Sequence, residues 1–302
     1  MLPTRQIQIR DPFALPVADE GAYYLFGTTW RTPGASPAGF DCYRSSDLAS
    51  WEGPFPAFVP PPGFWSDRNF WAAEVHEMDG AFHMFASFKA QGRYRGTQVL
   101  RADAPGGPYR VHSDGPVTPA HWECLDGTLH VDARGDPWIV FCHEWVQIHN
   151  GSVCAMRLSA DLSRAVDRPV YLFSATDAPW VLPVKGEDPA CRFPCYVTDG
   201  PFLHRTASGE LLMLWSSIGA GGYTQGLARS DDGTVTGRWE QAPEPLWSGD
   251  GGHGMLFRTF DGRLTLSLHC PNSGGPERAV FLPVAETDGG LRITRPKGVT
   301  QR

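Results

Sequence analysis

One pattern recurs five times along this chain of 302 residues: a glycine-containing turn followed by a run that alternates large apolar and aromatic residues. The turns lie at Gly21, Gly80, Gly135, Gly209 and Gly262, so successive copies are 59, 55, 74 and 53 residues apart. Another short apolar run precedes each turn, as expected for two antiparallel strands joined in a hairpin. Alternation with a period of two predicts strands rather than helices. The repeat therefore predicts an all-β protein made of five similar units.

Each unit has room for four strands, because further strand-like runs and Asp/Gly turns follow each hairpin. Four-stranded sheets repeated around an axis predict a single-domain, five-bladed β-propeller. The expected blades cover roughly 5–65, 66–118, 119–190, 191–247 and 248–302, and the N-terminal residues are candidates to close the last blade. The long step between the third and fourth copies predicts an inserted loop over 174–195. A lipocalin-like barrel or a sandwich is the alternative, but neither accounts for five hairpins at near-equal spacing.

Composition excludes several classes of function and partner. The net charge is −7 and no run of Lys or Arg stands out, so we expect neither nucleic acid nor a membrane as a partner. Seven cysteines without zinc-ligand spacing indicate buried free thiols in a reducing compartment. No signal-like segment opens the sequence, so we expect a cytoplasmic protein, or a secreted one if a signal peptide has been removed. The pattern carries no prediction of oligomeric state.

Polar residues lie at the ends of the hairpin strands. In a propeller the first strand of each hairpin starts beside the axis and the second returns to the same face, so residues just outside the hairpins should meet at one mouth. Those before the first strands are Asp11, Glu74, Asp126, Asp199 and His253; those after the second strands are Trp30, Lys89, Glu144, Ser216 and His269. Clustered carboxylates raise each other's pKa, which suits acid–base catalysis. Paired carboxylates at a concave site are typical of glycoside hydrolysis.

Side chains near this mouth are also candidates to bind a sugar. Aromatic rings there could stack on sugar rings; the candidates are Trp30, Trp65, Phe70, Trp71 and Trp145. Together with the polar groups, the predicted substrate-binding set is Trp30, Phe70, Trp71, Glu74, Arg229 and His269. The expected partner is therefore an oligosaccharide or polysaccharide.

Five short motifs, one per predicted blade and in order, resemble glycoside hydrolase family 43, the arabinanase, arabinofuranosidase and xylosidase group. They cover 10–12, 71–75, 125–127, 199–202 and 252–254. The resemblance implies hydrolysis with inversion, with Asp11 as the general base and Asp126 adjusting the pKa and orientation of the general acid. It also implies that His253 helps to hold a central ion, often calcium, mainly through waters. No other cofactor is expected.

The sequence departs from this family at one position. The family's general acid is normally a glutamate, and Asp199 stands in its place with a side chain one methylene shorter. Proton transfer needs contact within about 3 Å, directly or through one water. Either Asp199 is the acid with altered geometry, or Glu144 has taken the role, with Glu187 of the inserted loop as a weaker third choice. We carry both Asp199 and Glu144 forward.

The predicted function is the release of arabinofuranosyl residues, ahead of xylosyl residues, from plant-type oligosaccharides or polysaccharides. Two alternatives stay open from the residues alone. The aspartate in place of glutamate would suit a catalytically inactive, carbohydrate-binding propeller. A related glycosidase acting on galactosyl or fructosyl linkages would carry the same motifs.

Overall fold

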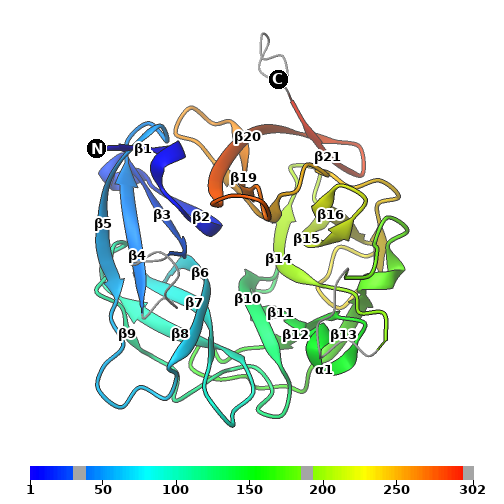
Figure 1. Cartoon of the computed structure of the whole chain (residues 1–302), viewed down its shortest axis with the longest axis horizontal. Coiled ribbons are helices and arrows are strands. Elements are labelled where there is room, and N and C mark those ends of the chain that lie inside the picture. The colour runs from blue at the N-terminus through cyan, green and yellow to red at the C-terminus, as the bar shows by residue number, and fades with distance from the viewer. Residues whose placement is uncertain (30–38, 185–192, 295–302) are drawn as a thin grey trace.

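The computed structural model describes residues 1–29, 39–184 and 193–294, which form five antiparallel sheets arranged around a central axis (Figure 1). This architecture confirms the all-β, five-bladed propeller. The first blade contains β1 (Leu2–Pro3), β2 (Arg10–Val17), β3 (Ala22–Thr28), β4 (Phe40–Ser45) and β5 (Ser50–Phe58). The second contains β6 (Arg68–Met78), β7 (Ala81–Lys89), β8 (Gly96–Ala102) and β9 (Arg110–Val111).

The remaining blades have four strands each. The third contains β10 (Cys124–Val131), β11 (Pro137–His143), β12 (Ser152–Arg157) and β13 (Val170–Ser174). The fourth contains β14 (Asp199–Arg205), β15 (Leu211–Gly219), β16 (Gly222–Ser230) and β17 (Trp239–Gln241), and the fifth β18 (Gly252–Arg258), β19 (Leu264–Cys270), β20 (Arg278–Thr287) and β21 (Gly290–Ile293). Helices are confined in the described chain to η1 (Thr4–Gln6), η2 (Ala18–Glu20), α1 (Trp145–Ile148) and η3 (Ala175–Asp177), and none is long and apolar enough to cross a membrane.

The N-terminal segment does not close the last blade as a strand, which corrects the expectation from the sequence. Instead β1 pairs with β5, Leu2 opposite Trp51, and adds a fifth strand to the first blade. The four strands of the last sheet all come from residues 252–293. The segment still contacts that blade, because the Ile9 N–H donates to the Glu277 carbonyl at 3.1 Å.

The innermost strand of every blade has the same irregularity at the end nearer the mouth. Its register with the second strand shifts there, and one residue adopts a left-handed backbone conformation. These residues and their φ angles are Asp11 (56°), Ala72 (49°), Asp126 (55°), Gly200 (49°) and His253 (53°). Such a bulge turns a side chain away from the ordinary alternation of a strand. Non-glycine residues adopt this conformation uncommonly, so its repetition marks a shared structural requirement.

A ring of hydrogen bonds fixes each bulge to the preceding blade. The Ala72 N–H donates to Thr28 Oγ1 at 2.9 Å, and the Asp126 and His253 N–H groups donate to Ser87 Oγ (2.9 Å) and Ser216 Oγ (2.8 Å). The Asp11 N–H donates to His269 Nδ1 at 3.2 Å, which joins the fifth blade to the first. These acceptors occupy one register position on the second strands: Thr28, Ser87, Ser216 and His269.

The third blade carries Cys142 at this position, and a thiol is a weak acceptor. Accordingly, the Gly200 N–H donates to Asp126 Oδ2 at 3.0 Å instead. Gly200 must be a glycine because a Cβ there would lie 2.7 Å from Cγ of His253. The carboxylate of Asp126 therefore replaces the missing hydroxyl and links the third and fourth blades.

Apolar packing between the first two blades centres on Phe88, which is fully buried. Its ring centroid lies 5.2 Å from that of Phe64 and 5.1 Å from that of Phe70, with further rings at Phe40, Phe58 and Trp65. Phe70 is itself only 1% exposed. The prediction that Phe70 stacks on a sugar is therefore wrong, and its ring belongs to the core.

The cysteines match the expectation of free thiols in part. Four free cysteines are buried, and Cys270, also free, is partly exposed. The buried ones are Cys42, Cys124, Cys142 and Cys154. Cys195 departs from the expectation, because it is disulfide-bonded.

We predict that Phe88→Ala lowers the free energy of unfolding by about 3–5 kcal/mol, because it removes a buried ring that its neighbours cannot fully replace. Denaturant unfolding followed by tryptophan fluorescence measures this change. Phe55→Ala is the matched control, because Phe55 is 46% exposed on β5 and its loss should change stability by no more than about 0.5 kcal/mol. Equal effects of the two substitutions would contradict the packing described here.

Candidate active site

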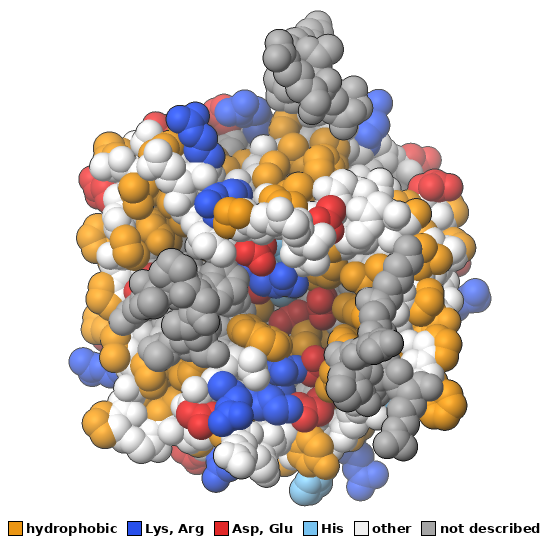
Figure 2. Space-filling view, in the orientation of Figure 1, with side chains coloured by type: hydrophobic (Ala, Val, Ile, Leu, Met, Phe, Trp, Pro, Cys, Tyr) orange, Lys and Arg blue, Asp and Glu red, His pale blue; other side chains and the backbone are white. Residues whose placement is uncertain are grey.

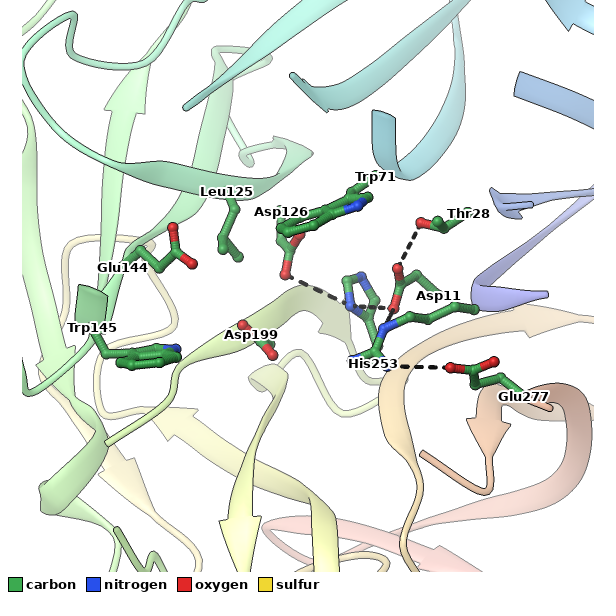
Figure 3. Close-up of a pocket in the computed structure, with 11 residues that line it drawn as sticks. Asp11, Thr28, Trp71, Leu125, Asp126, Glu144, Trp145, Asp199, His253 and Glu277 are labelled. Atoms are coloured by element: carbon green, nitrogen blue, oxygen red, sulfur yellow. Dashed lines mark hydrogen bonds and ion pairs between the residues drawn. The ribbon is translucent and has the colours of Figure 1, made fainter. Parts of the chain in front are cut away.

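The bulges surround a cavity of about 320 Å³ at the mouth of the propeller axis. Figure 2 shows this hollow near the centre of the face, with Asp and Glu side chains inside it. Its lining comes from all five blades: Arg10, Asp11, Thr28, Trp71, Leu125, Asp126, Glu144, Trp145, Asp199, His253 and Glu277. The structure thus brings Asp11, Asp126, Asp199, Glu144 and His253 to one opening, as the sequence predicts (Figure 3).

Asp11 is a buried carboxylate held on both oxygens. Thr28 Oγ1 donates to Oδ2 at 2.9 Å, and His253 Nδ1 lies 3.1 Å from Oδ1 (Figure 3). Arg10 Nε lies 3.6 Å from Oδ1. Burial opposes ionisation, but the charges of His253 and Arg10 outweigh it and hold the pKa of Asp11 well below its usual range. Asp11 is therefore ionised at neutral pH.

His269 supports Asp11 from within the fold. It is fully buried, and burial lowers its pKa to about 4, so the ring is neutral. Since Nδ1 accepts the Asp11 N–H, the ring proton lies on Nε2, which is 3.2 Å from Asn272 Oδ1 and donates to it. Although Nδ1 lies 3.5 Å from Asp11 Oδ1, the two do not form an ion pair, because the ring is neutral. The sequence predicts that His269 binds substrate, but it does not line the cavity; its contact is with the backbone of Asp11, which it helps to position.

Asp126 and Asp199 form a pair of carboxyls with raised pKa values. Burial raises the pKa of Asp199 to about 7, and the charge of Asp126 adds to the effect. Burial also raises the pKa of Asp126 to about 6, although His253 opposes it. The Tyr223 hydroxyl donates to Asp199 Oδ2 at 3.0 Å. No Lys, Arg or His nitrogen in the described chain lies within 4.0 Å of the Asp199 carboxyl oxygens, so no cation holds it ionised by direct contact.

Glu144 has a different environment from Asp199. Its carboxyl forms an ion pair with Arg95, whose guanidinium lies 4.3 Å from the ring centroid of Trp71. Burial raises the pKa of Glu144 to about 7, and Arg95 opposes this by favouring the carboxylate. Glu144 is thus fixed by a cation at the wall of the cavity, whereas Asp199 is free to carry a proton.

His253 has its imidazole between two carboxylates. Burial opposes protonation, but Asp11 and Asp126 raise its pKa to about 10. Nδ1 is 3.1 Å from Asp11 Oδ1 and 3.7 Å from Asp126 Oδ2, while Nε2 is buried and has no hydrogen-bond partner in the part of the chain that the structure describes. The described residues contain no group of three or more His, Cys, Asp or Glu that could hold a metal. With its raised pKa the His253 ring is protonated and Nε2 carries a hydrogen, so an ion at the axis could use Nε2 only if His253 lost that proton, with water supplying most of the other ligands.

Other predicted site residues are placed as follows. Trp71 lines the cavity. Glu74 does not: it is buried beside His76, whose Nε2 lies 3.2 Å from its Oε2. Arg229 is 43% exposed away from the mouth, where its guanidinium pairs with Glu210 and Glu240, so the prediction that it binds substrate is wrong. Trp30 and Glu187 lie outside the described residues.

The bulges explain why Glu74 does not reach the cavity, although its position in the sequence predicts that it does. Ala72, not Glu74, occupies the position equivalent to Asp11 and Asp126, and Gly200, not Asp199, occupies it in the fourth blade. Asp199 still reaches the cavity because it immediately precedes the bulge residue. Cys142 occupies in the third blade the register position that Thr28 occupies in the first. Glu144 follows it by two residues, just past the end of the second strand nearer the mouth.

Several residues of the site carry no role in the sequence analysis. Arg10 reaches Glu277, with NH1 3.6 Å from Oε1, and its guanidinium lies 5.8 Å from the ring centroid of Tyr223. The position of Arg10 next to Asp11 is a signal that could have found it. Tyr223 lies at the start of β16 and Glu277 directly precedes β20, the third strands of their blades, and neither carries a local signal. Trp145, named as a candidate for stacking, does line the cavity.

The chain is similar to known proteins in sequence and in structure. Residues 2–289 match the family described as "Glycosyl hydrolases family 43". An endo-arabinase from Bacteroides thetaiotaomicron VPI-5482 is similar in structure, with a TM-score of 0.89 and 38% identity, over 96% of this chain and 99% of that one. A Cellvibrio cellulosa α-L-arabinanase solved with arabinohexaose shares the fold, with a TM-score of 0.66 and 18% identity over 95% and 96% of the two chains.

A curated relative matches a smaller part of the chain. It is the extracellular exo-α-(1→5)-L-arabinofuranosidase ArbA of Cellvibrio japonicus (strain Ueda107), 25% identical over 179 residues. The match covers 54% of this chain and 47% of the relative, so it spans about half the length of each.

Proposed function

This chain belongs to glycosyl hydrolase family 43 and is a glycoside hydrolase, and we propose that it cleaves arabinofuranosyl linkages, ahead of xylosyl linkages, in arabinose-containing oligosaccharides and polysaccharides. The observation that carries the proposal is the cavity in which an ionised Asp11 faces carboxyls with raised pKa values. The endo-arabinase and exo-arabinofuranosidase similar to this chain support the choice of sugar.

Asp11 is the general base in this proposal. A base must be ionised when it takes a proton from the attacking water, and the contacts of Asp11 with Thr28 and His253 keep it so. Inversion requires room for a water between the base and the sugar, with the two catalytic carboxyls about 6.5–9.5 Å apart. A cavity of about 320 Å³ offers space for a sugar ring and that water.

Asp199 is the general acid that the contacts favour over Glu144. An acid must hold a proton near neutral pH, and the burial of Asp199 and the charge of Asp126 both favour its protonated form. Glu144 is bound to Arg95, which favours its charged form and fixes its position. In this assignment Asp126 keeps Asp199 protonated, and Glu144 accepts hydrogen bonds from sugar hydroxyls.

A calcium ion at the axis would need a neutral His253, whose Nε2 has no hydrogen-bond partner among the described residues and could then serve as one ligand beside a shell of waters. When bound, such an ion would supply positive charge to the site. The residues described above perform acid–base catalysis without any step through it.

We predict that Asp11→Asn lowers kcat on arabino-oligosaccharides by about 10²–10⁴-fold, because the water then lacks its base. Product analysis by chromatography measures turnover, and proton NMR of the first product shows the anomer released. Asp114→Asn, which changes an exposed aspartate, is the control, and thermal unfolding checks that both variants fold. Normal turnover by a folded Asp11→Asn protein would reject the base; sugar binding by wild type without turnover would point to a binding protein.

The acid can be identified by changing the leaving group. We predict that Asp199→Asn lowers kcat/KM by about 10²–10⁴-fold on natural linkages but much less on a dinitrophenyl arabinofuranoside, whose leaving group needs little protonation. Glu144→Gln should affect both substrates equally, mainly through KM. The reverse pattern would make Glu144 the acid.

The pH dependence of kcat/KM provides a separate prediction. The acid must be protonated, so the rate should fall as the pH rises through about 7, the value to which burial and Asp126 raise the pKa of Asp199. Asp126→Asn removes a neighbouring negative charge and should move this fall to lower pH. A fall at unchanged pH in that variant would show that Asp126 does not control the acid.

A further inference from the structure

A second cavity, of about 370 Å³, lies beside the catalytic one. We call it the Arg93 cavity. Its lining combines the end of the β5–β6 connection with the β7–β8 and β9–β10 connections: Trp65, Gly92, Arg93, Tyr94, Arg95, Pro116, Pro119, Ala120 and His121. Arg95 joins the two cavities, because its guanidinium contacts Glu144 and lies over Trp71, both of which line the catalytic cavity. A saccharide bound at Asp11 could therefore extend past Arg95.

The Arg93 cavity is positively charged in a protein whose net charge is −7. Lys89 is paired with Glu123 (Nζ to Oε1, 2.5 Å) and Arg95 with Glu144, so these charges are compensated. Arg93 has no carboxylate partner in the described chain. Nε of Arg95 is buried and has no hydrogen-bond partner within residues 1–29, 39–184 and 193–294. Lys and Arg side chains gather at the rim below the central hollow in Figure 2.

Aromatic side chains form the rest of the wall. The Arg93 guanidinium lies 5.8 Å from the ring centroid of Trp65, and Trp65 Nε1 donates to Gln98 Oε1 at 2.6 Å, which fixes the indole. Tyr94 is 47% exposed. An aromatic face suits a sugar ring, and a planar guanidinium suits a carboxylate, which it can bind through two parallel hydrogen bonds. The two features together fit an acidic sugar.

We infer that the Arg93 cavity binds a uronosyl residue of the substrate, with the sugar carboxylate on Arg93 and the ring against Trp65 or Tyr94. The inference rests on the proposed function for the position of the scissile bond, which would lie in the neighbouring catalytic cavity. It goes further by assigning a charged substituent to the substrate. A cavity of about 370 Å³ is near the lower end of ligand sites, which suits one sugar residue.

The test uses two oligosaccharides that differ in one group. One carries an arabinofuranosyl residue linked near a uronosyl residue, and the other is the same compound after reduction of the carboxyl to an alcohol. We expect wild type to have a kcat/KM about tenfold higher on the acidic compound, as a charge-assisted hydrogen bond would provide. Arg93→Gln should bring the ratio to about one. Arg93→Lys should keep part of the preference, because lysine retains the charge but not the planar fork.

Arg134→Gln is the matched control. Arg134 is also exposed but lies in the β10–β11 turn, away from the mouth, so the ratio should stay at the wild-type value. Added salt should lower the ratio in wild type and in Arg134→Gln, since it screens the pairing of exposed charges. A ratio of one in wild type, or a ratio unchanged by Arg93→Gln, would overturn the inference.

Binding without turnover separates this inference from the proposed function. Calorimetry on the Asp11→Asn protein measures binding affinity in the absence of turnover. The probes are galacturonate and glucuronate oligosaccharides and their carboxyl-reduced forms. Preference for the acidic forms that disappears in Asp11→Asn/Arg93→Gln supports the inference even if wild type fails to cleave arabinofuranosides. Equal binding of acidic and reduced forms overturns it, even if arabinofuranoside cleavage is normal.

Discussion

The left-handed bulge on each innermost strand is the constraint on which the rest of the site depends. It turns Asp11, Asp126 and His253 toward the axis from three different blades, and its N–H is tied to a neighbouring blade. A non-glycine residue adopts this conformation at a cost of about 1–3 kcal/mol, which surrounding contacts must offset. The hydrogen bonds between blades supply such contacts. The bulges therefore both join neighbouring blades and orient the functional side chains toward the axis.

Burial at the axis, together with the charges nearby, gives the carboxyls of the site different pKa values and therefore different roles. All of them lose hydration, which raises their pKa values. Asp11 is the exception because His253 and Arg10 stabilise its charge, whereas Asp199 has the negative charge of Asp126 nearby and no Lys, Arg or His nitrogen of the described residues within 4.0 Å. An ionised carboxylate and a protonated one can therefore coexist in one cavity, which is what acid–base catalysis requires.

Errors in sequence reasoning about the site come from the bulges and from packing. The position just before the first strand of each hairpin predicts Asp11 and Asp126 correctly, but in the second blade it predicts Glu74, because a register shift there changes which residue turns toward the axis. Aromatic residues near the mouth look alike in sequence, yet Phe70 is in the core while Trp71 lines the cavity. Adjacent residues of a strand point in opposite directions, and only the local register decides which one faces substrate.

The sequence by itself determined the repeat, the five sheets and the short motifs that carry the carboxylates and His253. It could do so because strand alternation and turn glycines are local signals. Tertiary structure alone decided the pairing of Glu144 with Arg95, the contact of Asp199 with Tyr223 and the position of Arg93 beside Trp65. These contacts join separate strands and connections around the ring, and the pKa values depend on distances and burial that no local pattern encodes.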